Sequence, residues 1–368
     1  MTEGHGAVHR EPLVRIVKRG DISTRKIWLI RALAALGAAL TGALLILALG
    51  HNPVSVYTQL VLGAVGSKTV LVETIKKAIP LLGAAVAIAP AFKMKFWNIG
   101  AEGQIMAGAI AASYFALFYS QSLPRPVLLA VMFLAAVLAG AVWGVIPALF
   151  KAKWGTNETL FTLMFNYIIL GFERYLQNGP WKKPSSGGFP KIAMFDNAAK
   201  LPRLFGVHIG WVLVLLLVVG MAVYLRRSKQ GYEIAVVGES EPTARYAGMN
   251  VPRIIIRTML ISGAVAGLVG FLQVSGVNYT LTENTAGGIG FTAITVAWLA
   301  RLNPVIMVFI AGFLAILQKG SGRIQTVFLI PASAAEVLTG IILFFMLGCE
   351  FFIRYRLVLR GGKERKHG

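Results

Sequence analysis

The densest group of polar side chains beside an apolar run lies at Phe96-Trp97-Asn98-Ile99-Gly100-Ala101-Glu102-Gly103-Gln104. Inside a membrane, such a carboxylate and such carboxamides are costly unless they face protein or a water-filled path. Asn98 and Gln104 offer paired hydrogen-bond donors and acceptors to a polar solute, and glycines let the backbone approach a ligand. With Glu102, the motif indicates either a solute-binding group or an interhelical hydrogen-bond cluster that shapes a pore without touching solute.

A second polar cluster, Gly155-Thr156-Asn157-Glu158-Thr159, opens an apolar stretch that also contains Asn166. Thr156 or Asn157 is suited to cap a helix that begins at Glu158, and the negative charge of Glu158 suits the positive end of that helix. This pattern favours a structural role for Glu158. Asn157, Glu158 and Asn166 are also candidates for a solute pathway.

Clustered glycines precede a short apolar segment at Gly287-Gly288-Ile289-Gly290-Phe291. Such clusters are typical of the broken helices with which transporters expose backbone groups at a binding site. Gly288, Gly290 and Phe291 are therefore further candidates for the solute pathway.

Motifs for covalent chemistry are missing from the sequence. Gly66-Ser67-Lys68-Thr69 lacks the Gly-Lys step and the upstream glycine of a phosphate-binding loop, so ATP binding by that route is not expected. The five histidines fall in segments predicted to be loops or termini, which argues against a metal or acid-base centre. We predict no catalytic residue, no metal site and no cofactor in this chain.

The composition predicts a membrane protein. Of 368 residues, 56% are hydrophobic and 14% are charged, which is too apolar for a soluble domain of ordinary design. The formal net charge of +21 does not indicate nucleic-acid binding, because the basic residues lie in short loops and at the termini. The single cysteine, Cys349, excludes an intrachain disulfide.

The elements that position these motifs are predicted to be helices. We expect an all-α polytopic bundle of about ten transmembrane segments, each needing roughly 20 apolar residues. The predicted spans are residues 28–50, 78–92, 98–119, 127–150, 158–178, 209–225, 254–276, 289–301, 304–318 and 333–353. The span at 289–301 is short enough for a half-helix. Gly140 with Gly144, and Gly263 with Gly267, are spaced to let helices approach closely.

Lys and Arg are more frequent in the segments that this order places inside, so both termini are expected in the cytoplasm. Residues 1–27 form a basic arm, 28–353 the membrane domain and 354–368 a basic tail. The outer loop, residues 179–208, is either a passive connector or a landing surface for an extracytoplasmic protein.

A polar interruption at residues 226–252 lies on the predicted cytoplasmic side. Its second half is expected to form a helix over 239–250, capped by Glu239 or Ser240, with Pro242 near the first helical position. One side of this helix would be nearly bare and suited to lie in a groove of another protein. The small residues on that side are Ala244, Ala247 and Gly248.

These motifs together resemble one family. Gly231-Tyr232-Glu233-Ile234, Val237-Gly238-Glu239 and Ala244-Arg245-Tyr246-Ala247-Gly248-Met249-Asn250-Val251 are similar to the coupling loop of ATP-binding-cassette importer permeases, in the branch of ribose, branched-chain amino acid and nucleoside permeases. The 96–104 motif resembles the signature of the nucleoside and sugar permeases. The Asn157-Glu158 pair with Met164-Phe165-Asn166-Tyr167 is typical of the nucleoside branch. The resemblance covers most of residues 75–350.

The resemblance implies a permease of a bacterial or archaeal plasma membrane, energised by separate ATPase subunits that bind the ATP. It also implies a second permease, expected to be a paralogue, and an extracytoplasmic substrate-binding protein. Closure of the ATPases would push the 239–250 helix and reorient the helices around Asn98, Glu102, Gln104 and Asn166, so that the solute is released inward. The residues implied in coupling are Gly231, Gly238, Glu239, Pro242, Ala244, Arg245, Ala247 and Gly248.

A nucleoside is the solute that this resemblance favours. A permease for ribose or another simple sugar is an alternative within the family. A self-powered secondary transporter or channel is an alternative from another class, but it leaves the 226–252 segment unexplained.

Overall fold

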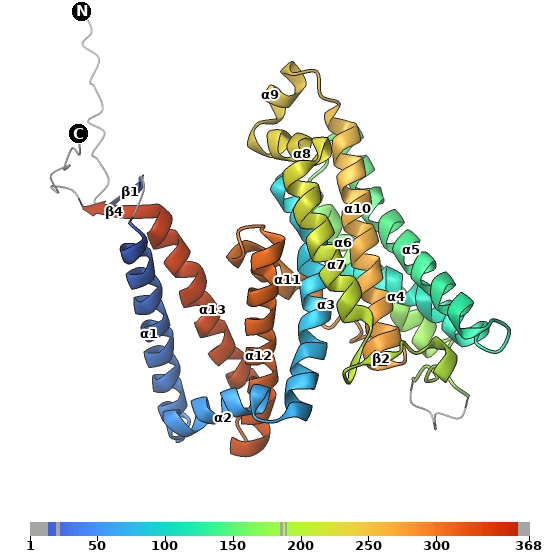
Figure 1. Ribbon diagram of the computed structural model, residues 1–368, viewed down its shortest axis with the longest axis horizontal. Coiled ribbons are helices and arrows are strands. Elements are labelled where there is room, and N and C mark those ends of the chain that lie inside the picture. Colours follow the sequence, from blue (N-terminus) through green and yellow to red (C-terminus); the bar gives the residue numbers. More distant parts are fainter. Residues whose placement is uncertain (1–13, 20–22, 185–186, 188–189, 360–368) are drawn as a thin grey trace, which may run out of the picture. The chain divides into compact units, whose positions relative to one another are not determined.

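The computed structural model describes residues 14–19, 23–184, 187 and 190–359 (Figure 1). Most of the predicted basic arm, the end of the predicted basic tail and four residues of the outer loop therefore lie outside the described residues. The chain divides into two compact units. Unit 1 comprises residues up to Leu60 and from Ser321, and unit 2 comprises Val61–Gly320.

The described residues form thirteen α-helices, with one π-helical segment, one short 3-10 turn and two small antiparallel ribbons. The α-helices are α1 (Thr24–Ala48), α2 (Pro53–Val65), α3 (Lys68–Lys93), α4 (Ala101–Phe118), α5 (Arg125–Trp154), α6 (Glu158–Asn178), α7 (Gly210–Arg227), α8 (Lys229–Glu239), α9 (Glu241–Tyr246), α10 (Val251–Leu272), α11 (Ile289–Leu299), α12 (Pro304–Phe328) and α13 (Ala332–Arg354). The remaining elements are η1 (Asn197–Ala199), η2 (Gln273–Asn278), and the strand pairs β1 (Val14–Lys18) with β4 (Tyr355–Leu359) and β2 (Arg203–Leu204) with β3 (Val207–His208).

Each predicted span coincides with a helix of the structure. Seven helices are long and apolar enough to cross a membrane: α1, α3, α5, α7, α10 with η2, α12 and α13. Helix α11 has 11 residues, which agrees with the predicted half-helix. Helix α3 begins at Lys68 rather than near residue 78, because the Ser67 side chain accepts a hydrogen bond from the Val70 amide and caps an earlier turn.

Unit 1 is built around the pair α1 and α13. The two helices meet closely at two glycines of α1. An added Cβ at Gly37 would lie 2.6 Å from the Phe345 ring, and one at Gly42 would lie 2.7 Å from Leu338. Beyond these helices, β1 pairs with β4, and the Arg19 amide donates to the Arg354 carbonyl at 2.8 Å.

Unit 2 is a helical bundle in which α10 packs against α3, α4 and α5. Helices α8 and α9 lie at one end of this bundle, and β2 lies toward the other end (Figure 1). An added Cβ at Gly140 of α5 would lie 2.3 Å from the Gly263 carbonyl oxygen of α10, and one at Gly108 of α4 would lie 2.2 Å from the Gly267 oxygen. The predicted close packing through Gly140 and Gly263 is confirmed, because only glycine permits this backbone contact.

Gly267→Ala is expected to destabilise unit 2 by roughly 1–3 kcal/mol, the usual cost of overpacking. The reason is that the new Cβ would lie 2.2 Å from the Ala136 carbonyl oxygen, and backbone cannot yield as a side chain does. Thermal unfolding of the purified chain in detergent measures the effect. Gly312→Ala is the matched control, since no atom lies within 4 Å of its added Cβ. Equal midpoints for the two variants would refute the packing argument.

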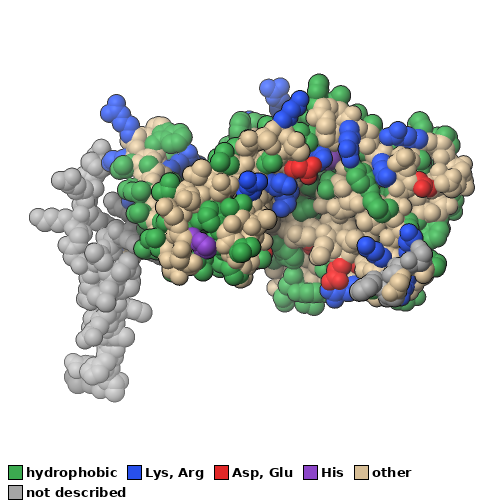
Figure 2. Space-filling model, turned by 90° about the horizontal axis from the view of Figure 1, so that it is seen from below, with side chains coloured by type: hydrophobic (Ala, Val, Ile, Leu, Met, Phe, Trp, Pro, Cys, Tyr) green, Lys and Arg blue, Asp and Glu red, His purple; other side chains and the backbone are tan. Residues whose placement is uncertain are grey.

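Basic side chains are spread over the face of the protein drawn in Figure 2. Among the described residues on this face, Lys and Arg lie singly or in small groups between apolar and neutral surface. This distribution differs from the clustered basic stripe of a nucleic-acid-binding surface.

Candidate functional site

The two carboxamides of the 96–104 motif bind each other. Asn98 Nδ2 donates to Gln104 Oε1 at 3.2 Å, and Gln104 Nε2 donates to Asn98 Oδ1 at the same distance. Asn98 also contacts Ser262 Oγ of α10 at 3.4 Å and accepts the Gly100 amide at 3.1 Å. Both carboxamide side chains are buried. Their hydrogen-bonding capacity is therefore largely directed at other parts of this chain.

Glu102 holds the start of helix α11. Its two carboxylate oxygens accept the backbone amides of Gly288 at 2.6 Å and Gly290 at 2.7 Å. The side chain is buried, and it lies at the N-terminal end of a helix, where free amides and the helix dipole favour a negative charge. An added Cβ at Gly290 would lie 2.4 Å from the Glu102 amide nitrogen, so glycine is required for this approach.

Asn166 joins α6 to the same place. Its Oδ1 accepts the Gly103 amide at 2.8 Å, and its Nδ2 donates to the Ile99 carbonyl at 3.0 Å. The side chain thus satisfies backbone groups on both sides of the α4 start. We call the set Asn98, Glu102, Gln104, Asn166 and Ser262 the polar junction.

The polar junction contains four of the predicted solute-pathway residues, Asn98, Glu102, Gln104 and Asn166, and Glu102 binds the backbone amides of two more, Gly288 and Gly290. Their mutual hydrogen bonds correspond to the interhelical cluster that the sequence left open as one of two interpretations. Contact with solute stays a prediction. Sequence reasoning missed Ser262, because a lone serine in an apolar stretch carries no signal of its partner.

Aromatic side chains hold the other end of α11. The Trp97 and Trp298 rings stack with centroids 5.7 Å apart and planes inclined by 16°, and Phe92 lies edge-on to Trp97 at 5.6 Å. The segment from Phe92 to Glu102 therefore contacts both ends of α11, the half-helix. Within it, residues 94–100 form the connecting turn between α3 and α4.

The three remaining solute-pathway candidates lie elsewhere. Asn157 caps α6 by accepting the Leu160 amide at 3.2 Å, as predicted. Glu158 pairs with Lys151 of α5 at 2.9 Å. Phe291 is exposed on α11 and makes no hydrogen bond in the junction.

Residues 226–252, which we call the coupling segment after their predicted role, do not form the single helix predicted over 239–250. The segment forms α8, Lys229–Glu239, and then the short α9, Glu241–Tyr246. Ser240 separates them with an extended backbone, and its side chain caps α9 by accepting the Thr243 amide at 3.3 Å, as predicted. The prediction of one helix to residue 250 is wrong, because Gly248 has a φ of +74°, which leaves the helical region.

The small residues predicted to form one exposed side of this helix do not share one environment. Ala244 is fully buried within the chain, whereas Ala247 and Gly248 are exposed. Arg245 pairs with Glu241 at 2.7 Å on the outer side of α9, beside Pro242. Tyr246 is the most exposed large side chain here, at 93%, and no sequence pattern singled it out as an exposed tip.

Helix α8 is fastened to the membrane bundle. An added Cβ at Gly238 would lie 2.1 Å from the Lys93 carbonyl oxygen, and one at Gly231 would lie 2.3 Å from the Tyr224 oxygen. Glu233 of α8 pairs with Arg257 of α10 at 2.8 Å. The end of α8 therefore rests directly on the start of the connecting turn.

A polar hollow of about 240 Å³ lies between the α8–α9 junction and the connecting turn. Glu239 and Glu241 line it from the coupling segment, and Lys95, Lys151 and Glu158 line it from the bundle. The structure thus brings Glu158 next to Glu239, one of the residues predicted to act in coupling. Lys95, in the connecting turn, has a φ of +60°, a strained conformation for a non-glycine residue.

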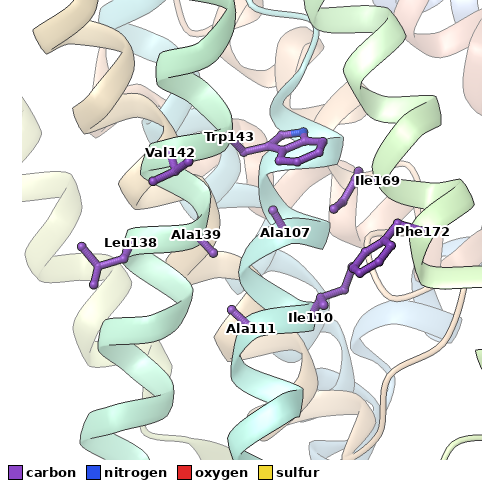
Figure 3. Close-up of a pocket in the computed structure, with 9 residues that line it drawn as sticks. All are labelled: Ala107, Ile110, Ala111, Leu138, Ala139, Val142, Trp143, Ile169 and Phe172. Carbon is purple, nitrogen blue, oxygen red and sulfur yellow. The ribbon is translucent and has the colours of Figure 1, made fainter. Parts of the chain in front are cut away.

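A second hollow, of about 380 Å³, is wholly apolar (Figure 3). Ala107 and Ile110 of α4 lie between Leu138 and Trp143 of α5 and Phe172 of α6. A polar solute finds no hydrogen-bond partner on this lining apart from the Trp143 indole. The groove suits lipid or another apolar surface rather than a solute site.

His208, beside α7, is a buried structural residue. Added Cβ atoms at Gly210 and Gly276 would lie 2.6 and 2.7 Å from its ring, and neither ring nitrogen has a hydrogen-bond partner among the described residues. Burial, and then the charge of Lys76, lower the pKa of His208 from 6.5 to about 4.

We expect stability to fall as the pH falls below 6.5. Between 6.5 and about 4 the unfolded chain binds a proton at His208 that the folded protein does not, which costs roughly 3 kcal/mol in total. His208→Leu should remove this contribution to the pH dependence of the free energy of unfolding. Thermal unfolding midpoints of the wild type and of His208→Leu, measured between pH 4 and 8, test this prediction. Midpoints that change equally with pH in the two proteins would contradict the burial argument.

Comparison with known proteins agrees with this architecture. The family model "Branched-chain amino acid transport system / permease component" matches residues 70–347. The glucose ABC transporter permease protein TsgB13 of Haloferax volcanii is 35% identical over 88% of this chain and 88% of its own length. The nucleoside permease protein NupB of Lactococcus lactis is 30% identical over 91% and 94%, and the guanosine permease protein NupP of Bacillus subtilis is 30% identical over 89% and 93%.

No solved structure matches the chain. The family match spans both the polar junction and the coupling segment, α8 with α9. It also includes the helices that carry them. The chain is therefore a multi-pass membrane protein that belongs to the branched-chain amino acid transport system permease family, the non-catalytic transport subunits of ATP-binding-cassette importers.

Proposed function

We propose that this chain is the permease of a nucleoside importer. The observation that carries the proposal is the similarity over nearly full length to two permeases named for nucleosides or guanosine. The Asn157-Glu158 pair and the Met164-to-Tyr167 motif support the same branch. A monosaccharide is the second candidate, because the relative at 35% identity is named a glucose permease.

The proposed assembly contains ATPase subunits, a second permease and an extracytoplasmic binding protein. About ten segments cross the membrane, with α4, α6 and the short α11 added to the seven long apolar helices, and both termini face the cytoplasm. The ATPase contacts α8 and α9, where exposed Tyr246 and the Arg245–Glu241 pair form the outer surface. ATP is bound by the partner subunits.

Movement of α8 has a short physical route to α11. Gly238 rests on the Lys93 carbonyl, at the start of the connecting turn. The turn leads to Trp97, which stacks on one end of α11, and to Glu102, which holds the other end. A displacement of α8 therefore reaches a half-helix at membrane depth through backbone contacts and two side chains.

Uptake of labelled guanosine and glucose, in cells with and without the gene, tests the proposed solute. Uptake that needs the gene, is competed by excess unlabelled nucleoside and is not competed by glucose supports the proposal. Competition by glucose alone assigns the sugar instead. Loss of uptake on collapse of the proton gradient, with ATP maintained, would overturn the importer mechanism.

A further inference from the structure

A cleft of about 600 Å³ separates the first turns of α1 from the last turns of α13, within unit 1. The two helices touch at Gly37, where an added Cβ would meet Phe345, and they part toward Lys26 and Phe352. No atom lies within 4 Å of an added Cβ at Gly348 of α13, so the cleft is open beside that residue. This volume is in the range of small-molecule sites.

The walls of this cleft are apolar and its mouth is basic. Leu29, Leu33, Phe344, Phe345 and Phe352 supply most of the wall. Arg19 and Lys26 line the same cleft, and neither forms an ion pair with a carboxylate in the described part of the chain. Among the described residues, the lining contains no acidic side chain. Its described part therefore combines an apolar slot with the positive charges of Arg19 and Lys26.

The mouth of the cleft has side-chain types expected at the level of lipid headgroups. Trp28 is 64% exposed, and Arg31 lies 5.5 Å from its ring centroid, an arrangement typical of the membrane interface. The wall residues Leu29 and Phe344 are 60% and 73% exposed, as expected for side chains that meet acyl chains. Backbone bonding of Arg19 to Arg354 fixes Arg19 at this level.

We propose that this basic cleft is a binding site for an anionic phospholipid, whose phosphate contacts Arg19 and Lys26 and whose acyl chain lies along α1 and α13. Charge complementarity selects the anionic headgroup, since each nearby basic side chain favours an anionic lipid by about fivefold. The apolar walls select a lipid over free phosphate. The site does not depend on the transported solute.

Cys349 gives a built-in probe, because it lines the cleft and is the single cysteine of the chain. The purified full-length chain is placed in nanodiscs of phosphatidylcholine alone or with phosphatidylglycerol, and the rate of maleimide addition to Cys349 is measured. We expect phosphatidylglycerol to slow the reaction several-fold in the wild type. An equal rate in both lipids would overturn the proposal.

Two variants separate the site from the surface potential of the membrane. Arg19→Ala with Lys26→Ala should remove the protection, whereas Arg226→Ala with Arg227→Ala, at the end of α7, should retain it. If phosphatidylglycerol still slows the reaction in the Arg19→Ala, Lys26→Ala variant, the effect comes from the surface potential of the membrane, and the proposed site is refuted. Gly348→Phe fills the open space and should lower the number of phosphatidylglycerol molecules retained in native mass spectrometry.

The other occupants give distinct results. If soluble glycerol phosphate slows the maleimide reaction of Cys349 as much as phosphatidylglycerol does, the ligand is a free anion rather than a lipid. Retention of phosphatidylcholine as strong as that of phosphatidylglycerol would show a slot without charge selection. Efficient disulfide cross-linking of two chains through Cys349 would assign the cleft to a second copy. Each of these outcomes overturns the proposal.

Discussion

Glu102→Ala is expected to abolish uptake and to destabilise the bundle by roughly 2–4 kcal/mol, since the buried Gly290 amide and the partly buried Gly288 amide each lose their acceptor. The carboxylate accepts the Gly288 and Gly290 amides at the start of α11. Without this contact the half-helix is held at its Trp298 end alone. Uptake in cells and thermal unfolding of the purified variant measure the two effects.

Glu102→Gln distinguishes loss of charge from loss of shape. Glutamine keeps one oxygen acceptor but points an NH₂ group at the second amide, so we expect an intermediate loss of both stability and uptake. Glu283→Ala is the control, because the exposed Arg174–Glu283 pair should contribute at most ~1 kcal/mol. If Glu102→Ala unfolds at the same temperature as this control, the carboxylate does not hold α11.

Gly238→Val is expected to reduce uptake at least tenfold while the protein still inserts in the membrane. Even the Cβ would lie 2.1 Å from the Lys93 carbonyl oxygen, so α8 must move away from the connecting turn. A 1 Å displacement of a positioned element is enough to cost a large factor in function. Uptake, together with ATP hydrolysis by the assembled transporter, measures the loss and shows whether hydrolysis continues without transport.

Gly220→Val is the matched control for this substitution. Gly220 lies on the exposed side of α7, and no atom is within 4 Å of its added Cβ. Its uptake should stay close to that of the wild type at equal membrane abundance. Normal uptake by Gly238→Val would show that α8 does not act through the connecting turn.

The apolar pattern of the sequence was sufficient to predict the helices of the ten expected spans, but not α2 or α8, because every membrane-spanning backbone must satisfy its own hydrogen bonds. Local capping was predictable for the same kind of reason. Asn157 and Ser240 bond amides three residues away, so the partners are adjacent in the sequence. The helix expected over 239–250 was predicted too long, because Gly248 has a positive φ and α9 ends at Tyr246.

The roles of the polar residues depended on contacts that the sequence does not reveal. Glu102 and Gly288 are 186 positions apart, and Asn98 and Ser262 are 164 apart, so no local pattern links them. Gly238 and Lys93 are also distant in the sequence, and they meet because α8 packs on the end of α3.

By itself the sequence determined that this chain is a multi-pass helical membrane protein and which importer family it resembles. Hydrophobic periodicity, charge bias and short motifs are local properties, and they survive in a linear string of residues. Only the tertiary structure decided that Glu102 binds the start of α11, that Asn98 binds both Gln104 and Ser262, that α11 is held at both ends, and that α1 and α13 part around a basic cleft. Those outcomes depend on which helices pack together, and packing is a property of surfaces distant in sequence.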